Sequence, residues 1–140
     1  MVKLLATYEV RGGPLGASHG GLFVIDLANR TAVKQLDWAE SPSDLRLLNE
    51  DLGMRGVACD SGAIYVVTSD WLLKYSRDFH QLAAWQNAYL KHCHEMHIHR
   101  RRLFIASTGF DSIIGFDLDR QVFDWALHVD VRGQIPKGKV

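Results

Sequence analysis

The sequence is poor in cysteine and has no excess of either charge, and both features exclude several kinds of protein. Its two cysteines, Cys59 and Cys93, are too few in 140 residues for a disulfide framework, so we expect reduced thiols. Its 16 basic and 16 acidic residues cancel. This balance argues against bulk electrostatic binding to nucleic acid or to an anionic membrane. The one basic run, Arg100 to Arg102, is typical of a solvated hairpin turn.

Long apolar runs and helical spacing are also missing. No stretch approaches the roughly 20 apolar residues that a membrane span needs. The first apolar run is interrupted at Tyr8 and Glu9, which leaves it too short for a signal-peptide core. We therefore expect a cytoplasmic protein with no membrane or nucleic-acid partner. The best helical candidate is the segment from Ser43 to Glu50, which has room for one or two turns.

The sequence contains an internal repeat instead. The segment from Arg55 to Ser69 aligns with the segment from His94 to Thr108, at an offset of 39 residues. Each copy continues into two further runs rich in Val, Ile, Leu, Phe and Tyr, separated by Gly, Asp, Asn and Ser at turn spacing. Four short strands in about 40 residues is the pattern of one β-propeller blade.

The repeat divides the sequence into three such units, so the predicted fold is all-β. We expect a first blade over about residues 3–38, an insert over 39–54, a second blade over 55–87, a third over 94–129 and a tail over 130–140. The first blade has no innermost strand, because its opening run, Lys3 to Val10, corresponds to a second strand. The tail contains Gly133, Pro136 and Gly138, which favours an irregular tail or a swapped arm over a strand.

The units lack the Gly-His and Trp-Asp signatures of WD40 blades. Over roughly residues 15–129 the sequence resembles propellers of the NHL, YVTN and gluconolactonase type, above all in the segments Tyr89 to Ile98 and Ala106 to Asp117. The resemblance extends to bacterial propeller proteins of uncharacterised function. It implies a propeller fold, and it brings no catalytic residue with it.

Three blades do not close a ring, because propellers typically need at least four. An open set would leave apolar faces and unpaired backbone exposed, which favours association. Two copies supply six blades, a common closed number. We therefore expect a homodimer that forms a six-bladed ring, in which the first blade of one copy packs against the third blade of the other. The alternative is that the chain is a fragment of a longer propeller.

Four histidines within eight residues form the most unusual cluster of the sequence. Alternation along a strand places Glu95, His97 and His99 on one face and His94 on the other. The pattern favours histidines that line a blade interface. A divalent metal held by His94, Glu95 and His97, and general acid–base catalysis, are the alternatives.

The repeat also places polar residues together at one end of the blades. Arg55 and His94 occupy equivalent positions at the start of the innermost strands, and loops that follow the second strands reach the same end. We expect a polar ligand-binding face there, made from Arg55, His94, Glu95, His19, Asp70 and Asp111. In a purely structural role Arg55 would pair with a nearby carboxylate such as Asp70 or Glu95 and hold the channel.

Other polar and aromatic residues fit structural roles. Asp26 and Asp117 are predicted to bond to backbone at strand turns. The tryptophans are predicted to pack between blades: Trp38, Trp71, Trp85 and Trp125.

Three functions are compatible with these patterns. The first is a propeller-type binding module with no enzymatic activity and no cofactor, whose channel face is completed by self-association. The second is a metal-dependent hydrolase or lyase of the gluconolactonase type that uses the histidine and glutamate cluster. The third is a structural fragment of a longer propeller.

Overall fold

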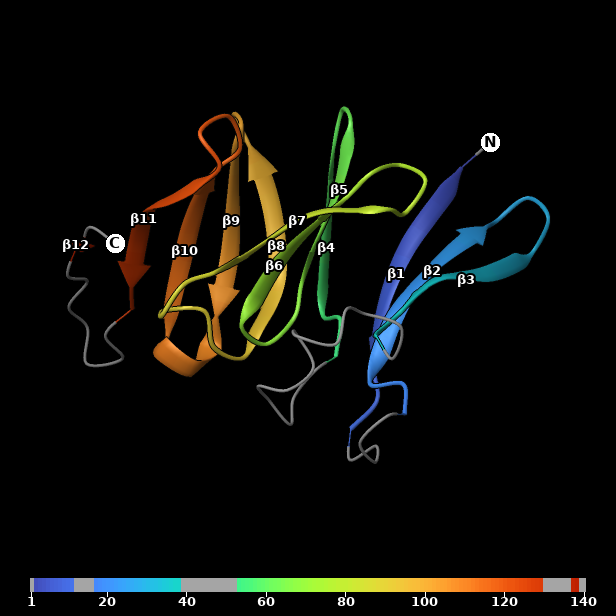
Figure 1. Cartoon of the computed structure of the whole chain (residues 1–140), viewed down its shortest axis with the longest axis horizontal. Helices are drawn as coiled ribbons and strands as arrows, with labels where there is room; N and C mark the ends of the chain where they lie inside the picture. Colours follow the sequence, from blue (N-terminus) through green and yellow to red (C-terminus); the bar gives the residue numbers. More distant parts are fainter. Residues whose placement is uncertain (1, 12–16, 39–52, 130–136, 139–140) are drawn as a thin grey trace.

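The computed structural model describes residues 2–11, 17–38, 53–129 and 137–138. These residues form three antiparallel sheets, each a meander in which every strand pairs with the next along the chain (Figure 1). No α-helix occurs in the described ranges, so the all-β prediction is confirmed. The helical candidate at 43–50 and most of the insert lie outside these ranges.

Sheet 1 has three strands, and sheets 2 and 3 each begin with an additional inner strand. Sheet 1 comprises β1 (Lys3–Glu9), β2 (Gly20–Asp26) and β3 (Thr31–Asp37). Sheet 2 comprises β4 (Gly56–Asp60), β5 (Ala63–Val67), β6 (Trp71–Tyr75) and β7 (Gln81–Gln86). Sheet 3 comprises β8 (Cys93–His99), β9 (Arg102–Ser107), β10 (Ser112–Asp117) and β11 (Val122–His128), with a 3₁₀ turn, η3 (Thr108–Phe110), before β10.

Two residues of the predicted irregular or swapped tail form a strand, and the rest of the tail lies outside the described residues. Residues Lys137–Gly138 form β12, which pairs with β11 of the same chain and extends sheet 3 to five strands. The two residues avoid Pro136, which has no backbone N–H to donate to a strand ladder. A short edge strand can therefore form here although Pro136 and Gly138 are residues that strands disfavour.

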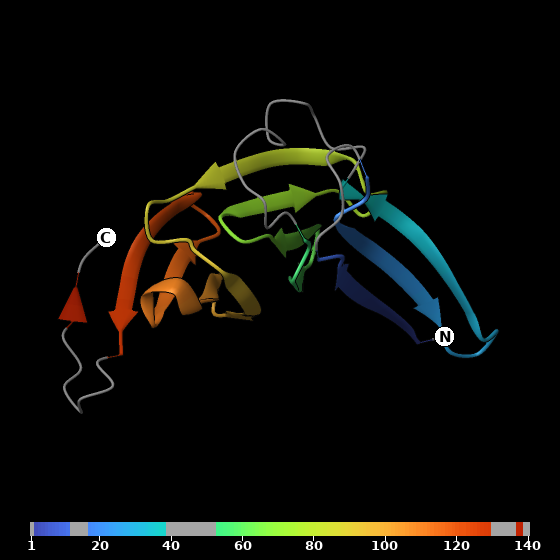
Figure 2. The same cartoon turned by 90° about the horizontal axis from the view of Figure 1, so that it is seen from below.

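The three sheets follow one another along an arc. In Figure 2 the first strands of the three sheets, β1, β4 and β8, lie on the concave lower side, and β3, β7 and β11 lie on the convex upper side. The inner strands approach closely, because an added Cβ at Gly56 on β4 would lie 2.1 Å from the carbonyl oxygen of His94 on β8. Glycine at this position lets the two strands come together.

Two apolar cores lie between the sheets, one on each side of sheet 2. The strand β5 is buried along its whole length, which explains its unbroken apolar sequence Ala-Ile-Tyr-Val-Val. Its residues Ile64 and Val66 belong to the core shared with sheet 1, and Tyr65 and Val67 to the core shared with sheet 3. Each such side chain contributes roughly 1.5–3 kcal/mol by leaving water.

The tryptophans occupy these cores with one exception. Trp38 and Trp71 belong to the core between sheets 1 and 2, and Trp85 contacts Phe116 in the core between sheets 2 and 3. Their predicted packing is confirmed. Trp125 instead contacts Phe104 within sheet 3, on the face turned away from sheet 2.

The hairpin turns lie at the end of the sheets that is uppermost in Figure 1. Asp26 accepts hydrogen bonds from two backbone amides of its turn, and so does Asp117, as predicted. These backbone N–H groups lower the pKa of both carboxyls. The basic run forms an exposed hairpin turn, as predicted, and within it Arg101 pairs with Asp60 and Asp119 and thereby links the turns of sheets 2 and 3.

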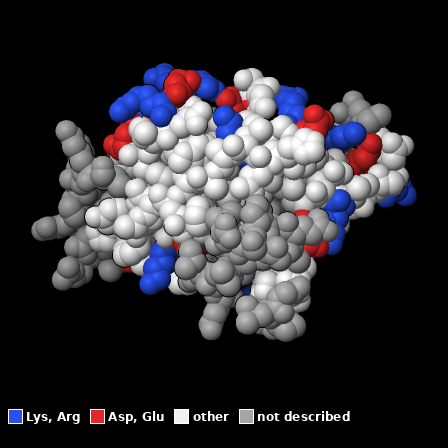
Figure 3. All heavy atoms as spheres, in the orientation of Figure 1, with Lys and Arg blue, Asp and Glu red and all other residues white. Residues whose placement is uncertain are grey.

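Charged side chains gather over these turns. Figure 3 shows acidic and basic groups side by side along the upper edge and few charges across the middle of the convex side. Among the described residues visible in this view, basic and acidic groups are interspersed along that edge.

Candidate functional site

The polar residues of interest lie at the opposite end of the sheets, which we call the loop end. It comprises the segments 9–11, 17–20, 53–56, 67–71, 86–94 and 107–112. The strand registers bring these segments to one level, because Glu9 pairs with Gly20, Gly56 with Val67, and Cys93 and Ser112 both with Ser107. This end is lowermost in Figure 1.

An ion pair between sheets 1 and 2 lies at the centre of the loop end. Nη2 of Arg55 lies 2.9 Å from Oε1 of Glu9, and the two side chains are 6% and 16% exposed. The hydroxyl of Thr7 also donates a 2.8 Å hydrogen bond to the Arg55 carbonyl. Arg55 thus pairs with a carboxylate that the sequence analysis did not name, because packing of the sheets brings the end of β1 against the start of β4.

His94 and Glu95 open β8 beside this pair. The close approach of the His94 carbonyl to Gly56 places His94 beside the start of β4, next to Arg55. A register irregularity between Cys93 and Met96 accommodates the two residues, with His94 half-buried and Glu95 exposed. The structure thus brings Arg55 and His94 to neighbouring strand starts, as the repeat predicted.

Asp70 lies next to them, before β6. The charges of Asp70 and Arg55 both act on the buried thiol of Cys93, in opposite directions. Burial is the largest effect on this thiol and raises its pKa to about 12. Cys93 is therefore a neutral thiol at physiological pH, unsuited to nucleophilic attack.

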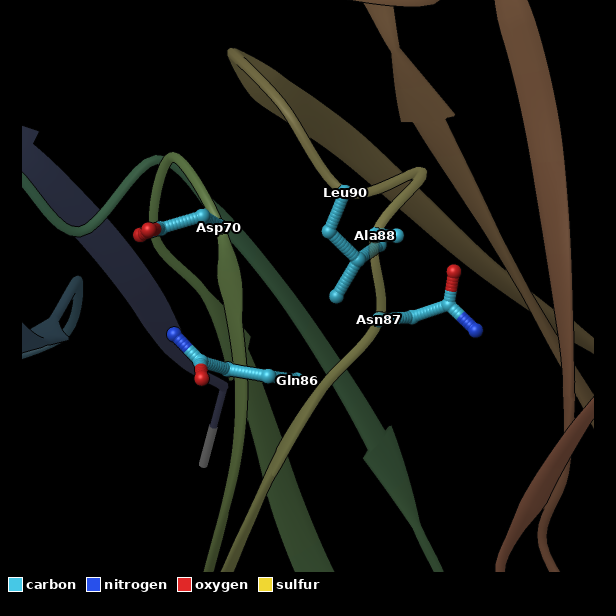
Figure 4. A pocket seen from close by; sticks show the side chains of 5 residues that line it. All are labelled: Asp70, Gln86, Asn87, Ala88 and Leu90. Carbon is cyan, nitrogen blue, oxygen red and sulfur yellow. The ribbon is translucent and has the colours of Figure 1, made fainter.

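A hollow of about 360 Å³ adjoins Asp70. It is lined by Asp70, Gln86, Asn87, Ala88 and Leu90. Figure 4 shows the Asp70 and Gln86 side chains projecting to the same side, while the Asn87 amide points the other way. The Asn87 carbonyl oxygen accepts a hydrogen bond from the Tyr89 amide and so shapes the loop. A carboxylate and an amide thus face one opening.

His19 and Asp111 lie at the same end but farther apart. His19 is buried in sheet 1, where its carbonyl accepts a hydrogen bond from the Val10 amide. Asp111 is exposed on sheet 3, and its carbonyl accepts one from Val129, beyond β11. Arg55, His94 and Asp70 therefore lie near one another at the loop end, with His19 on the side of sheet 1 and Asp111 on the side of sheet 3.

The predicted metal set does not assemble within this chain. Met96 and Ile98 face sheet 2, so Glu95 and His97 lie on the other face of β8 from them, and both are exposed. In the part of the chain that the structure describes, no three His, Cys, Asp or Glu side chains converge closely enough to hold a metal ion.

Sequence reasoning missed two serines that hold the loop end together. The Ser69 hydroxyl accepts the His92 amide, and its carbonyl accepts the Cys93 amide. The Ser107 hydroxyl accepts the Lys91 amide and lies 2.6 Å from the Tyr89 carbonyl, to which it donates. Both are buried. A paired Thr-Ser and Ser-Thr at equivalent places in the repeat, 68–69 and 107–108, was the signal available for them.

A Gly-x-Ser-x-Gly pattern also lies here, at residues 16–20. A nucleophile elbow of this pattern connects a strand to a helix. Ser18 instead precedes strand β2, and its hydroxyl donates weakly, over 3.4 Å, to the Gly20 carbonyl. Gly20 itself has a φ of +150° and lies where an added Cβ would meet the Tyr8 carbonyl oxygen at 2.3 Å. Gly20 therefore allows a close approach of two backbone segments.

No known protein family matches this chain, and no curated protein is similar to it. Within the described residues, no helix combines the length and apolarity required to cross a bilayer. The function is therefore argued from the site alone.

Proposed function

We propose that this chain is a half β-propeller that acts as a binding module for a small polar ligand at its loop end. The three meander sheets are its blades, β4 and β8 are innermost strands, and sheet 1 is a blade that lacks its innermost strand. The 39-residue repeat and the close approach of β4 to β8 support this arrangement.

The single observation that carries the binding role is the hollow beside Asp70. Its volume of about 360 Å³ falls in the range of small-molecule sites, roughly 300–1,000 Å³. Asp70 and Gln86 project to the same side of it. A carboxylate accepts hydrogen bonds only, so the ligand should carry donors such as an amine or several hydroxyl groups.

Binding is favoured over catalysis by the chemistry of the groups at this end. The Cys93 thiol is neutral, and Ser18 lies in a strand-preceding loop. The alternative of a metal-dependent hydrolase or lyase rests on His94, Glu95 and His97, and stays a prediction from sequence.

The proposal is tested by measuring the shift in melting temperature with a panel of diamines, amino acids and monosaccharides. A panel member should stabilise the natural chain and lose its effect with Asp70→Asn and with Gln86→Leu. Asp78→Asn, in an exposed turn of the same sheet, is the control and should keep the shift. A shift that survives Asp70→Asn, or the absence of any shift across the panel, would contradict the proposal.

A further inference from the structure

The three sheets differ in how their faces are covered. Sheet 2 has apolar cores on both faces, whereas sheets 1 and 3 each have one core, facing sheet 2, among the described residues. We call the remaining faces the outer faces of sheet 1 and sheet 3. Both are built from the same residue types as the covered faces.

In the 39-residue repeat, the outer face of sheet 3 corresponds to the face of sheet 2 that is buried against sheet 3. At the offset of 39 residues, Phe104 and Ala106 correspond to Tyr65 and Val67, which are buried against sheet 3. Ile113 pairs with Ala106 as Leu72 pairs with Val67. The outer face is therefore apolar: Phe104, Ala106, Ile113, Trp125 and Leu127. These side chains are only half-buried in the single chain.

Its centre is a flat aromatic surface. Gly115 on β10 has no side chain, and the Trp125 Cβ lies 3.1 Å from where a Cβ would be. The Trp125 indole also meets the Phe104 ring edge-on, with centroids 5.6 Å apart. A large ring pair over a glycine is shaped to receive another apolar surface.

The outer face of sheet 1 supplies such a surface. Leu4 pairs with Ile25, and Ala6 with Phe23, as Ile64 pairs with Tyr75 and Val66 with Leu73 in sheet 2. Those four residues of sheet 2 are buried against sheet 1. In sheet 1 itself Leu4 is 45% exposed, and Ala6, Phe23 and Ile25 are half-buried.

We propose that a second copy of this chain covers both faces. The outer face of sheet 3 in one copy packs on the outer face of sheet 1 in the other, repeating the contacts that sheet 2 makes inside the chain. A two-fold axis gives two identical joints and leaves no outer face uncovered. Six blades result, within the usual range of about four to eight. The inference rests on the half-propeller arrangement proposed above.

The contact between copies differs from the contacts inside the chain in the residues of the innermost strands. This difference creates a polar opening beside β8. On β4 the small residue Ala58 packs toward sheet 3, and on β8 its equivalent is His97, which is exposed. His97 and its neighbours Glu95 and His99 are too large for a close strand contact like that at Gly56. Sheet 1 begins with β1 and has no inner strand, so it leaves room for them. The second copy therefore completes a polar channel wall that one chain does not enclose.

The mass of the natural chain in solution, measured by light scattering at micromolar concentration, is the first test. We expect twice the chain mass of 15.8 kDa. A stable monomer, or an assembly of three or more copies, would overturn the proposal. Because no ligand is needed, this outcome is independent of the test of ligand binding.

Two charged variants then identify the faces. Phe104→Glu alters the outer face of sheet 3, and Phe23→Arg that of sheet 1, and each alone should halve the measured mass. Leu82→Glu is the control, because Leu82 is an exposed apolar residue of sheet 2, and it should remain a dimer. Circular dichroism checks that each variant is folded, and the more exposed Leu4→Ser replaces Phe23→Arg if that variant unfolds.

A mixture of the two charged variants distinguishes this joint from other contacts. One joint of the mixed dimer is then unaltered, and the other sets a glutamate against an arginine. Equimolar mixing should therefore restore the doubled mass. If sheet 3 of one copy instead packed on sheet 3 of the other, or sheet 1 on sheet 1, mixing would leave the measured mass halved. The proposed contact between sheet 3 and sheet 1 would then be wrong.

Discussion

The guanidinium of Arg55 lies 2.9 Å from the carboxylate of Glu9, and this pair joins β4 to β1 where sheets 1 and 2 meet at the loop end. The residues lie 46 positions apart in the sequence. Both side chains are largely removed from water, at 6% and 16% exposed, so the attraction between their charges is only weakly screened by solvent. The pair links the end of β1 to the start of β4.

Removing one partner of this pair should destabilise the fold strongly. We expect Glu9→Ala to lower the free energy of unfolding by about 2–3 kcal/mol, because it removes the carboxylate 2.9 Å from the largely buried Arg55 guanidinium. Urea denaturation measures the loss. Arg11→Ala is the matched control, since Arg11 contacts the same carboxylate at 3.3 Å but is 81% exposed, and it should cost less than about 1 kcal/mol.

The double variant Arg55→Met with Glu9→Leu separates the ion pair from simple packing. Replacing both charges by apolar groups of similar volume should recover most of the loss seen in Glu9→Ala. A double variant as unstable as the sum of the two single changes would contradict a direct interaction between them.

The approach of the two inner strands predicts a second effect. Gly56→Ala places a Cβ 2.1 Å from the His94 carbonyl oxygen, and a backbone atom has little freedom to move away. We expect a loss of about 1–3 kcal/mol, the usual cost of overpacking. Gly62→Ala, in the turn between β4 and β5, is the control because no atom lies within 4 Å of its added Cβ. Equal stability of the two variants in thermal denaturation would show that β4 and β8 are not in contact.

The strands were predictable from the sequence because their periodicity is local. The offset of 39 residues between Ile64 and Leu103 located β5 and β9, and the turn aspartates Asp26 and Asp117 marked the hairpins. Each of these signals depends on neighbours within a few residues. The predicted placement of Arg55 and His94 at adjacent strand starts followed from the same repeat.

The partner of Arg55 was not predictable in this way. Its contact with Glu9 depends on how sheet 1 packs on sheet 2, and the 39-residue repeat does not relate the two residues, because among the described residues sheet 1 begins with β1. In the sequence Glu9 only interrupts an apolar run. The hydrogen bonds that the Ser69 and Ser107 hydroxyls accept from the His92 and Lys91 amides were missed for a similar reason. They join residues that lie 23 and 16 positions apart in the sequence.

The two cysteines should react at very different rates. Cys59 is exposed, whereas Cys93 is fully buried and burial raises the pKa of its thiol to about 12. Only the thiolate attacks an alkylating reagent. We expect iodoacetamide at neutral pH to label Cys59 in the folded protein and Cys93 only after unfolding, as read by peptide mass spectrometry. Labelling of Cys93 at the rate of Cys59 would mean that the core between sheets 2 and 3 opens readily.

The same thiol should make the protein less stable in alkaline solution. The ordinary pKa of a thiol is 9.0, so between about pH 9 and 12 the unfolded chain releases the Cys93 proton while the folded chain retains it. The folded state then binds more protons than the unfolded state, and the free energy of unfolding falls as pH rises, by roughly 1.4 kcal/mol per pH unit. Below pH 9 both states are protonated and this contribution is constant. Urea denaturation across this range should show a shallower fall for Cys93→Ala than for the natural chain, and parallel curves would contradict the assignment.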